Sequence, residues 1–280
     1  IKERMGGAEW CDWPVELRDR HDHAMGHIRH EARRNLKFHS FVQYLFHSQW
    51  MRLKHHANEK GVRMIGDLPI YVTYDSADVW SARHYFKLDE HMKPYVVAGV
   101  PPDYFSETGQ RWGNPVYEWG RLEHDRYDWW IMRMKRNLEL FDIVRLDHFR
   151  GFAAYWEIPA HEETAINGTW VDAPGERLFK AMGRRFSQLP IIAEDLGVIT
   201  ADVHLLRQSL GFPGMKVLQF AFGSSNGSNP DALHNHARDN VVYTGTHDNN
   251  TTLGWFDGEA SRDERTNFLT YMGSENDESN

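Results

Sequence analysis

Phe141-Asp-Ile-Val-Arg-Leu-Asp-His-Phe-Arg-Gly151 is the stretch of this sequence that decides the fold. It holds a short, mostly apolar run at residues 143–146, which ends abruptly in charged and aromatic residues. Such a run is typical of a buried parallel strand that presents polar groups at its C-terminal end. Barrels and doubly wound folds place their chemistry at that end of their strands.

Arg145 and Asp147 are expected to lie side by side there, because residues two apart share one face of a strand. A guanidinium group beside a carboxyl group favours its ionised form, which suits an anionic nucleophile at neutral pH. The other interpretation is an Arg–Asp pair with a purely structural role, and this stretch alone leaves both open. The rest of the chain is needed to decide between them.

The composition excludes several classes of protein. The chain has 280 residues, 41% of them hydrophobic, and a net charge of −8 without a basic stripe, so no nucleic-acid partner is expected. No run approaches the roughly 18 apolar residues of a membrane span, and the first residues lack a signal-peptide core, so no membrane partner is expected. The single cysteine, Cys11, rules out an internal disulfide framework and suits a reducing compartment. Four clustered histidines lack the spacing of converging metal ligands, so no metal site is predicted: His21, His23, His27 and His30.

Strands and helices are predicted to alternate along the chain. The predicted strands are residues 62–68, 142–147, 190–194, 215–222 and 241–247. Apolar residues at three- and four-residue spacing predict four helices. The first covers about 29–60 and ends at Gly61, the second covers about 125–140, and the third lies around 178–186. The fourth is capped by Thr200 and ends at Gly211. This alternation predicts an α/β fold with a parallel sheet.

Four of the five predicted strands end in an acidic residue: Asp67, Asp147, Glu194 and Asp248. Several carboxylates that converge on one rim repel one another unless they share a task, so their recurrence favours function. Carboxylates at neighbouring strand ends suit cleavage of a glycosidic bond. One of them attacks the sugar carbon, while a protonated one donates to the leaving oxygen.

Residues 73–119 lose the periodic pattern and are predicted to form a long active-site loop region. The region is rich in glycine, proline and aromatic residues. Its aromatic rings could stack on acceptor sugars and exclude water: Tyr104, Phe105, Trp112 and Tyr117. The other interpretation is that these rings only pin the loop to the body of the protein.

Seven motifs carry a resemblance to a known family. They are IGDLPIYV (65–72), DSADVW (75–80), AGVPPDYFSETGQRWGNPVY (98–117), VRLDHFRGF (144–152), IIAEDLGVIT (191–200), PGMKVLQFAFG (213–223) and VVYTGTHDN (241–249). In these stretches and in their order, the sequence resembles the 4-α-glucanotransferases called amylomaltase or disproportionating enzyme. These form glycoside hydrolase family 77 of the α-amylase clan.

The resemblance implies roles for individual residues. It implies that Asp147 is the nucleophile, Glu194 the acid/base and Asp248 the stabiliser of the transition state. Arg145 and His247 would line the same subsite, and Asp67 matches an acidic position of the clan. The implied reaction is transfer of α-1,4-glucan segments between maltooligosaccharides through a covalent glucosyl-enzyme, without metal or cofactor. The implied partners are maltooligosaccharides, amylose or starch-like α-glucans.

The same resemblance implies an α/β fold of the (β/α)8 TIM-barrel type that is incomplete. Residues 1–280 would form a partial catalytic barrel that lacks the first, second and last strands. Asn250 stands where the family usually has a second aspartate after THDN. Two alternatives remain open, namely an α-glucan hydrolase and a catalytically incomplete glucan-binding fragment. The implied location is the cytoplasm, or a plastid if the source is a plant or an alga.

Overall fold

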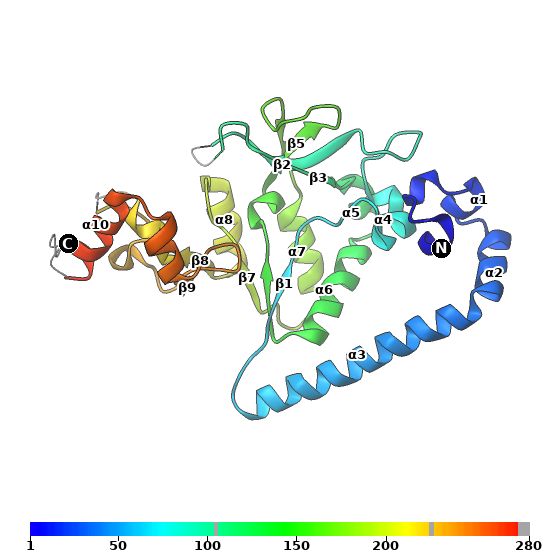
Figure 1. Cartoon of the computed structure of the whole chain (residues 1–280), viewed down its shortest axis with the longest axis horizontal. Helices are drawn as coiled ribbons and strands as arrows, with labels where there is room; N and C mark the ends of the chain where they lie inside the picture. The colour runs from blue at the N-terminus through cyan, green and yellow to red at the C-terminus, as the bar shows by residue number, and fades with distance from the viewer. Residues whose placement is uncertain (104–105, 224–226, 274–280) are drawn as a thin grey trace. The chain divides into compact units, whose positions relative to one another are not determined.

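The computed structural model of the chain describes residues 1–103, 106–223 and 227–273. Contacts between residues divide it into two compact units, Ile1–Pro190 and Ile191–Asn280. Both units combine helices with strands, so the predicted α/β fold class is confirmed (Figure 1). Among the described residues, no helix combines the length and the apolar character that crossing a membrane requires.

A parallel pair of strands forms the centre of the first unit. β1 (Ile65–Leu68) pairs with β4 (Ile143–Leu146), which confirms two predicted strands in shortened form. α6 (Asp128–Leu140) leads directly into β4 and buries Trp130 and Met134. Val144 is fully buried on β4, as expected for a strand covered on both faces. The first unit also contains α5 (Trp119–His124) and α7 (Gly175–Gly183), with the 3-10 turn η4 (Phe149–Phe152) after β4.

A second, antiparallel sheet lies in the first unit, and the sequence did not predict it. Its strand order is β3-β2-β5-β6, with β2 (Val96–Val100), β3 (Gln110–Pro115), β5 (Ala154–Pro159) and β6 (Thr169–Asp172). The expectation that 73–119 is irregular throughout is therefore wrong, because α4 (Ala77–Ala82), η3 (Arg83–Tyr85) and two of these strands fall inside it. Pairing of β2 with β3 shifts register between Val97 and Gly99, which removes the regular alternation that marks a strand in sequence.

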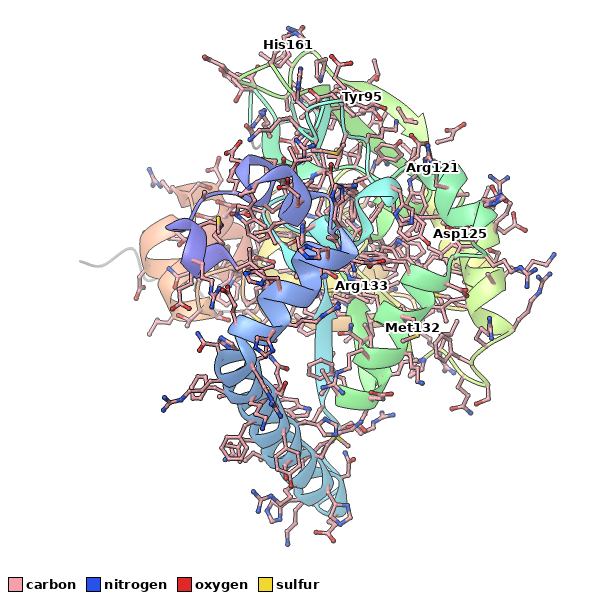
Figure 2. The ribbon with its side chains drawn as sticks, turned by 90° about the vertical axis from the view of Figure 1, so that its right-hand side faces the viewer. Tyr95, Arg121, Asp125, Met132, Arg133 and His161 are labelled. Atoms are coloured by element: carbon pink, nitrogen blue, oxygen red, sulfur yellow. The ribbon has the colours of Figure 1, made fainter. Side chains whose placement is uncertain are left out.

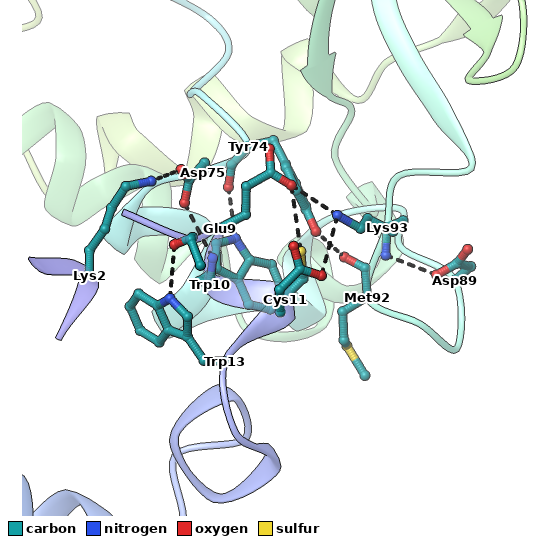
Figure 3. A network of polar contacts seen from close by, with 12 residues as sticks. Lys2, Glu9, Trp10, Cys11, Trp13, Tyr74, Asp75, Asp89, Met92 and Lys93 are labelled. Carbon is teal, nitrogen blue, oxygen red and sulfur yellow. Dashed lines mark hydrogen bonds and ion pairs between the residues drawn. The ribbon is translucent and has the colours of Figure 1, made fainter. Parts of the chain in front are cut away.

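The N-terminal segment is attached to residues 74–93 by a network of polar contacts (Figure 3). The indole of Trp10 donates from Nε1 to the carbonyl oxygen of Tyr74 at 2.9 Å, and Lys2 forms an ion pair with Asp75. The short elements here are η1 (Lys2–Met5), η2 (Trp10–Asp12) and α1 (Val15–Arg18). They precede α2 (Asp22–Glu31) and α3 (Arg33–Glu59), so the predicted helix over 29–60 is confirmed, with a break at Ala32.

α3 packs on the first unit by one side and leaves an apolar stripe exposed. Trp50 donates from Nε1 to the carbonyl oxygen of Leu140 at 2.8 Å, which fixes the C-terminal half of α3 against the end of α6. In contrast, Phe38, Phe41 and Phe46 are 62%, 55% and 51% exposed. The side chains of α3 stand out from the helix in the lower part of Figure 2. An exposed stripe of large apolar side chains marks either an interaction surface or a site of aggregation.

We expect the 280-residue chain to self-associate through this stripe. Replacing Phe38, Phe41 and Phe46 together with glutamine should shift the mass measured by light scattering towards that of a monomer. Burying three half-exposed rings contributes about 3 kcal/mol to association, and the substitutions remove this term. A control that changes exposed polar positions of the same helix (Ser40, Gln43 and Gln49 to alanine) should leave the mass unchanged. Equal masses for both triple variants would contradict the expectation.

The second unit contains shorter elements around its own core. β7 (Ile191–Ala193) is followed by α8 (Ala201–Leu210), which ends at Gly211 in the left-handed conformation, as predicted. β8 (Gly214–Val217) pairs in parallel with β9 (Asn240–Tyr243), while the 3-10 helix η5 (Leu218–Phe222) replaces the second half of the strand expected over 215–222. The other elements are η6 (Leu233–Asn235), α9 (Thr252–Gly254), the π-helical turn η7 (Trp255–Glu259) and α10 (Arg262–Tyr271).

Candidate active site

Asp67, Arg145 and Asp147 form one cluster at the C-terminal ends of β1 and β4. Asp67 lies directly across from Arg145 in the parallel ladder. The Nη1 atom of Arg145 donates to both carboxyl oxygens of Asp67 at 2.8 Å and to Oδ1 of Asp147 at 3.0 Å. The side-by-side placement of Arg145 and Asp147 that the sequence predicts is therefore confirmed.

The burial of this cluster is uneven. The side chain of Arg145 is 9% exposed, whereas those of Asp67 and Asp147 are 38% and 40% exposed. One buried cation thus holds two carboxylates that remain accessible from solvent. Burial of the guanidinium group strengthens its electrostatic attraction for both carboxylates. An ionised, accessible and oriented carboxylate is the group that nucleophilic attack on a sugar carbon requires.

His148 follows Asp147 and turns the chain sharply. Its backbone adopts the left-handed conformation with φ at 50°, and its ring meets Trp112 edge-on with the ring centroids 4.7 Å apart. Gly151 leaves room for this turn, since a Cβ atom there would lie 2.7 Å from Cδ1 of Ile70 and 3.1 Å from Cδ2 of His148. Burial, with a smaller contribution from the cation of Arg150, lowers the pKa of His148 to about 4. The imidazole beside the candidate nucleophile is therefore neutral at pH 7.

This depressed pKa makes the stability of the folded chain depend on pH. Between about pH 6.5 and pH 4 the unfolded chain takes up a proton at His148 that the folded chain does not. Stability is therefore lost as the pH falls through this window, by at most about 3 kcal/mol. We expect His148→Asn, which tolerates the left-handed backbone, to show a smaller loss in urea unfolding followed by tryptophan fluorescence. The control is His161→Asn at an exposed position (labelled in Figure 2), and parallel curves for all three proteins would contradict the prediction.

The four aromatic residues expected to bind sugar have different surroundings. Trp112 is 38% exposed and lies near the ring of Tyr71, with 6.4 Å between the ring centroids. Tyr117 is fully buried: its ring stacks on Tyr71, and its hydroxyl donates to the carbonyl oxygen of Ile70 at 2.6 Å. This burial contradicts the expectation that Tyr117 offers a face to a sugar and fits the alternative that it pins the loop. Tyr104 and Phe105 lie outside the described residues.

The second unit carries the other candidate residues. Glu194 directly follows β7, and its Oε1 atom accepts a hydrogen bond from the backbone N–H of Leu196 at 2.9 Å. His247 and Asp248 lie in the turn after β9, with Nε2 of His247 3.4 Å from Oδ1 of Asp248. The backbone N–H of Asp248 donates to Oγ1 of Thr246 at 3.2 Å, which fixes the turn. The side chains of His247 and Asp248 are both exposed.

Asn250, where the family pattern has an acid, is engaged inside the second unit. The side-chain amide of Asn250 donates to Oε1 of Glu259 at 2.8 Å, and the backbone carbonyl oxygen of Asn250 accepts from the side-chain amide of Gln219 at 2.9 Å. An aspartate at this position would face the carboxylate of Glu259 and repel it. The asparagine therefore suits the contacts that this chain makes.

Two other features of the first unit lie apart from these residues. Within the described parts of the chain, Glu9, Cys11 and Asp12 bring potential metal ligands within 4.8 Å of one another. The ammonium group of Lys93 lies 2.9 Å from Oε2 of Glu9 and 3.9 Å from Oδ1 of Asp12, so Lys93 already balances the charge of these carboxylates (Figure 3).

A cavity of roughly 430 Å³ is lined by Trp10, Trp13 and Trp80, among others, and by none of the candidate catalytic residues.

Sequence reasoning missed two residues that the structure places beside the candidates. His148 belongs to the motif VRLDHFRGF, but it is buried against Trp112, which lies 36 positions earlier in the sequence. A contact between residues so far apart has no local signal. Asp195 directly follows Glu194 and is buried, although an acidic residue in a loop is usually exposed. The doubled acid in IIAEDLGVIT was the available signal, because two adjacent residues at a strand end point in different directions.

Comparison with known proteins identifies the family. The model of the glycoside hydrolase family 77, described as 4-alpha-glucanotransferase, matches residues 1–280. A 4-alpha-glucanotransferase of Thermus thermophilus is 54% identical over 258 residues, which cover 91% of this chain and 51% of the relative. A chloroplastic/amyloplastic 4-alpha-glucanotransferase of Solanum tuberosum is 47% identical over 98% of this chain and 47% of its own length. The chain thus spans about half the length of these relatives.

A solved structure agrees with this assignment. An amylomaltase from Streptococcus agalactiae, determined in complex with acarbose, matches the whole chain with a TM-score of 0.94 at 40% identity. The match covers 56% of that protein. The sequence motifs, the fold and the relatives agree, and the chain belongs to the 4-alpha-glucanotransferase family.

Proposed function

We propose that this chain transfers α-1,4-glucan segments between maltooligosaccharides, amylose or starch-like α-glucans. The observation that carries the proposal is the buried Arg145, which holds two accessible carboxylates at the ends of adjacent strands. Membership of the 4-alpha-glucanotransferase family supports the reaction type, and the acarbose complex of the related amylomaltase supports ligand binding by this fold.

The proposed reaction has two steps. In the first, the carboxylate of Asp147 attacks the anomeric carbon, while Glu194 donates its proton to the oxygen of the leaving glucan. In the second, Glu194 takes the proton of an acceptor hydroxyl, whose oxygen attacks the anomeric carbon and releases Asp147. Each step inverts the anomeric configuration, so the α-linkage is retained. All the groups involved are side chains of the protein, and the proposed reaction uses no cofactor.

Other residues are proposed to support these two. Asp248 would stabilise the positive charge that develops on the sugar ring, with His247 in the same subsite. Arg145 keeps Asp147 ionised and oriented, and Asp67 holds Arg145 from the opposite strand. Trp112, Tyr104 and Phe105 would stack on acceptor sugars and exclude water, which favours transfer over hydrolysis.

We also propose that the chain is part of a (β/α)8 barrel that lacks the first, second and last strands. The parallel pairs β1–β4 and β8–β9 support this architecture, with α-helices between β1 and β4 and only short 3-10 helices between β8 and β9. The proposed location is the cytoplasm, or a plastid in a plant or alga. The chloroplastic/amyloplastic relative and the single cysteine support it.

Incubation with maltotriose tests the function and separates it from its alternatives. Transfer produces a ladder of longer oligosaccharides together with shorter ones, which chromatography resolves. Short sugars alone would indicate a hydrolase, because water then outcompetes the acceptor for the covalent intermediate. Binding of maltotriose in calorimetry without any product would indicate a glucan-binding fragment and would refute the proposed transfer.

A further inference from the structure

We infer that a buried ion pair, Asp195–Arg207, positions the carboxyl group of Glu194; this rests on the acid/base role proposed above for Glu194. Asp195 is the next residue after Glu194, and Arg207 lies on α8. Nε of Arg207 lies 3.1 Å from Oδ2 of Asp195, and the two side chains are only 7% and 6% exposed. Buried charges of this kind are costly unless they are paired.

The pair connects Asp195 to three other segments of the second unit. Nη1 of Arg207 donates to the carbonyl oxygen of Phe212 at 2.9 Å and to Oδ2 of Asp239 at 3.0 Å. Oδ1 of Asp195 accepts from the backbone N–H of Met215 at 2.8 Å. Asp195 is thereby tied to α8, to the start of β8 and to the residue before β9.

The backbone at Gly214 closes tightly over this pair. A Cβ atom at Gly214 would lie 2.5 Å from Oδ2 of Asp195, closer than real Cβ contacts come. The backbone N–H of Gly214 also donates to the carbonyl oxygen of Asp239 at 2.9 Å. The backbone at Gly214 therefore restricts the positions that the carboxyl group of Asp195 can occupy.

Glu194 stands between two anchored neighbours. On one side, the backbone N–H of Ala193 donates to the carbonyl oxygen of Pro213 at 2.9 Å. On the other, Asp195 is held by Met215 and Arg207. With both neighbours fixed, the Cα–Cβ direction of Glu194 is fixed too, and the hydrogen bond from Leu196 then orients its carboxyl group. An acid that protonates a leaving oxygen needs this orientation, because small displacements cost large factors in rate.

A contribution to stability is weak ground for the presence of this pair. A buried ion pair is often replaced by apolar residues without loss of stability, so its presence points to a requirement for geometry. Asp195 and Arg207 touch neither substrate nor reacting atoms in this proposal and act only through Glu194. They are positioning residues.

Amide hydrogen exchange tests the inference without relying on catalysis. In Asp195→Asn and in Arg207→Gln, we expect the amide of Leu196, which reports the bond to Glu194, to exchange at least about tenfold faster. The amides of α8, such as that of His204, should keep their exchange rates. The matched controls, Asp257→Asn and Arg238→Gln, change exposed residues of the same unit and should leave Leu196 unaffected. Unchanged exchange at Leu196, or loss of protection throughout α8 in both variants, would overturn the inference.

Kinetics with two donors provide the second readout. Asp195→Asn should lower kcat on maltotriose about 100-fold with little change in KM, because proton donation becomes misaligned. The first step on α-maltosyl fluoride, whose leaving group needs no proton, should change less than about threefold. Equal losses on both donors would overturn the inference. A wild-type chain without products would instead refute the proposed function, while the exchange experiment would still decide whether the pair orients Glu194.

Discussion

Replacing Asp147 by asparagine is expected to abolish both transfer and hydrolysis, lowering turnover of maltotriose by at least about 10⁴-fold. An amide oxygen is a poor nucleophile and a neutral one, so the covalent glucosyl-enzyme cannot form. The substitution preserves the volume of the side chain and still allows its oxygen to accept from Arg145 at the position now 3.0 Å away. The loss should therefore appear in the product ladder and not in the unfolding curve.

Two further variants make this result specific. Asp67→Asn removes the other carboxylate that Arg145 holds, and we expect a smaller loss because Asp67 does not bond to the sugar carbon in the proposed reaction. Asp172→Asn, at an exposed position at the end of β6, should keep the wild-type rate. A product ladder from Asp147→Asn comparable with that of the Asp172 control would remove Asp147 from the nucleophilic role.

Glu194→Gln is expected to produce a loss that depends on the leaving group. Glutamine has no proton of suitable acidity to give, so turnover of maltotriose should fall by about 10²–10⁴-fold. With α-maltosyl fluoride as donor, the first step needs no proton and should proceed at nearly the wild-type rate. Because the second step lacks its base, the glucosyl-enzyme should accumulate and be detectable by mass spectrometry of the intact protein.

The contrast between the two donors is the decisive measurement for Glu194. A good external nucleophile such as azide should restore release of the accumulated sugar, since an anion needs no base. If maltotriose and the fluoride lose the same factor, Glu194 does not act as the acid. Asp257→Asn is the control, because it changes an exposed carboxylate of the same unit.

Local periodicity was enough to predict the strands of the parallel pairs and the adjacency of Arg145 and Asp147. These features depend on residues two to four positions apart, which the sequence displays directly. The antiparallel sheet was missed for the opposite reason. β2 pairs with β5, about 60 positions further on, and each of these strands is short and interrupted by glycine or bounded by proline. Their order is therefore set by packing over long distances and not by a local pattern.

The exposure of the aromatic side chains could not be predicted from the local sequence either. Trp112 and Tyr117 lie five positions apart in a loop-like stretch, and composition does not tell which ring faces solvent. Tyr117 is buried because Tyr71 and Phe86 lie against its ring, and both come from earlier parts of the chain. The depressed pKa of His148 likewise results from burial, which no residue next to it in sequence determines.

Asp67 lies directly opposite Arg145 in the β1–β4 pair. The candidate site therefore forms only when the two strands pair in the correct register. The side-chain period of a strand is two, so a slip of one residue would set Val144 or Leu146 across from Asp67 and turn its partner cation to the opposite face. The mispaired strand would bury an uncompensated charge, at a cost of several kcal/mol. The charges of the candidate site therefore discriminate against misfolded pairings during folding. A neutral replacement of all three residues is expected to yield molecules that are folded but heterogeneous in register.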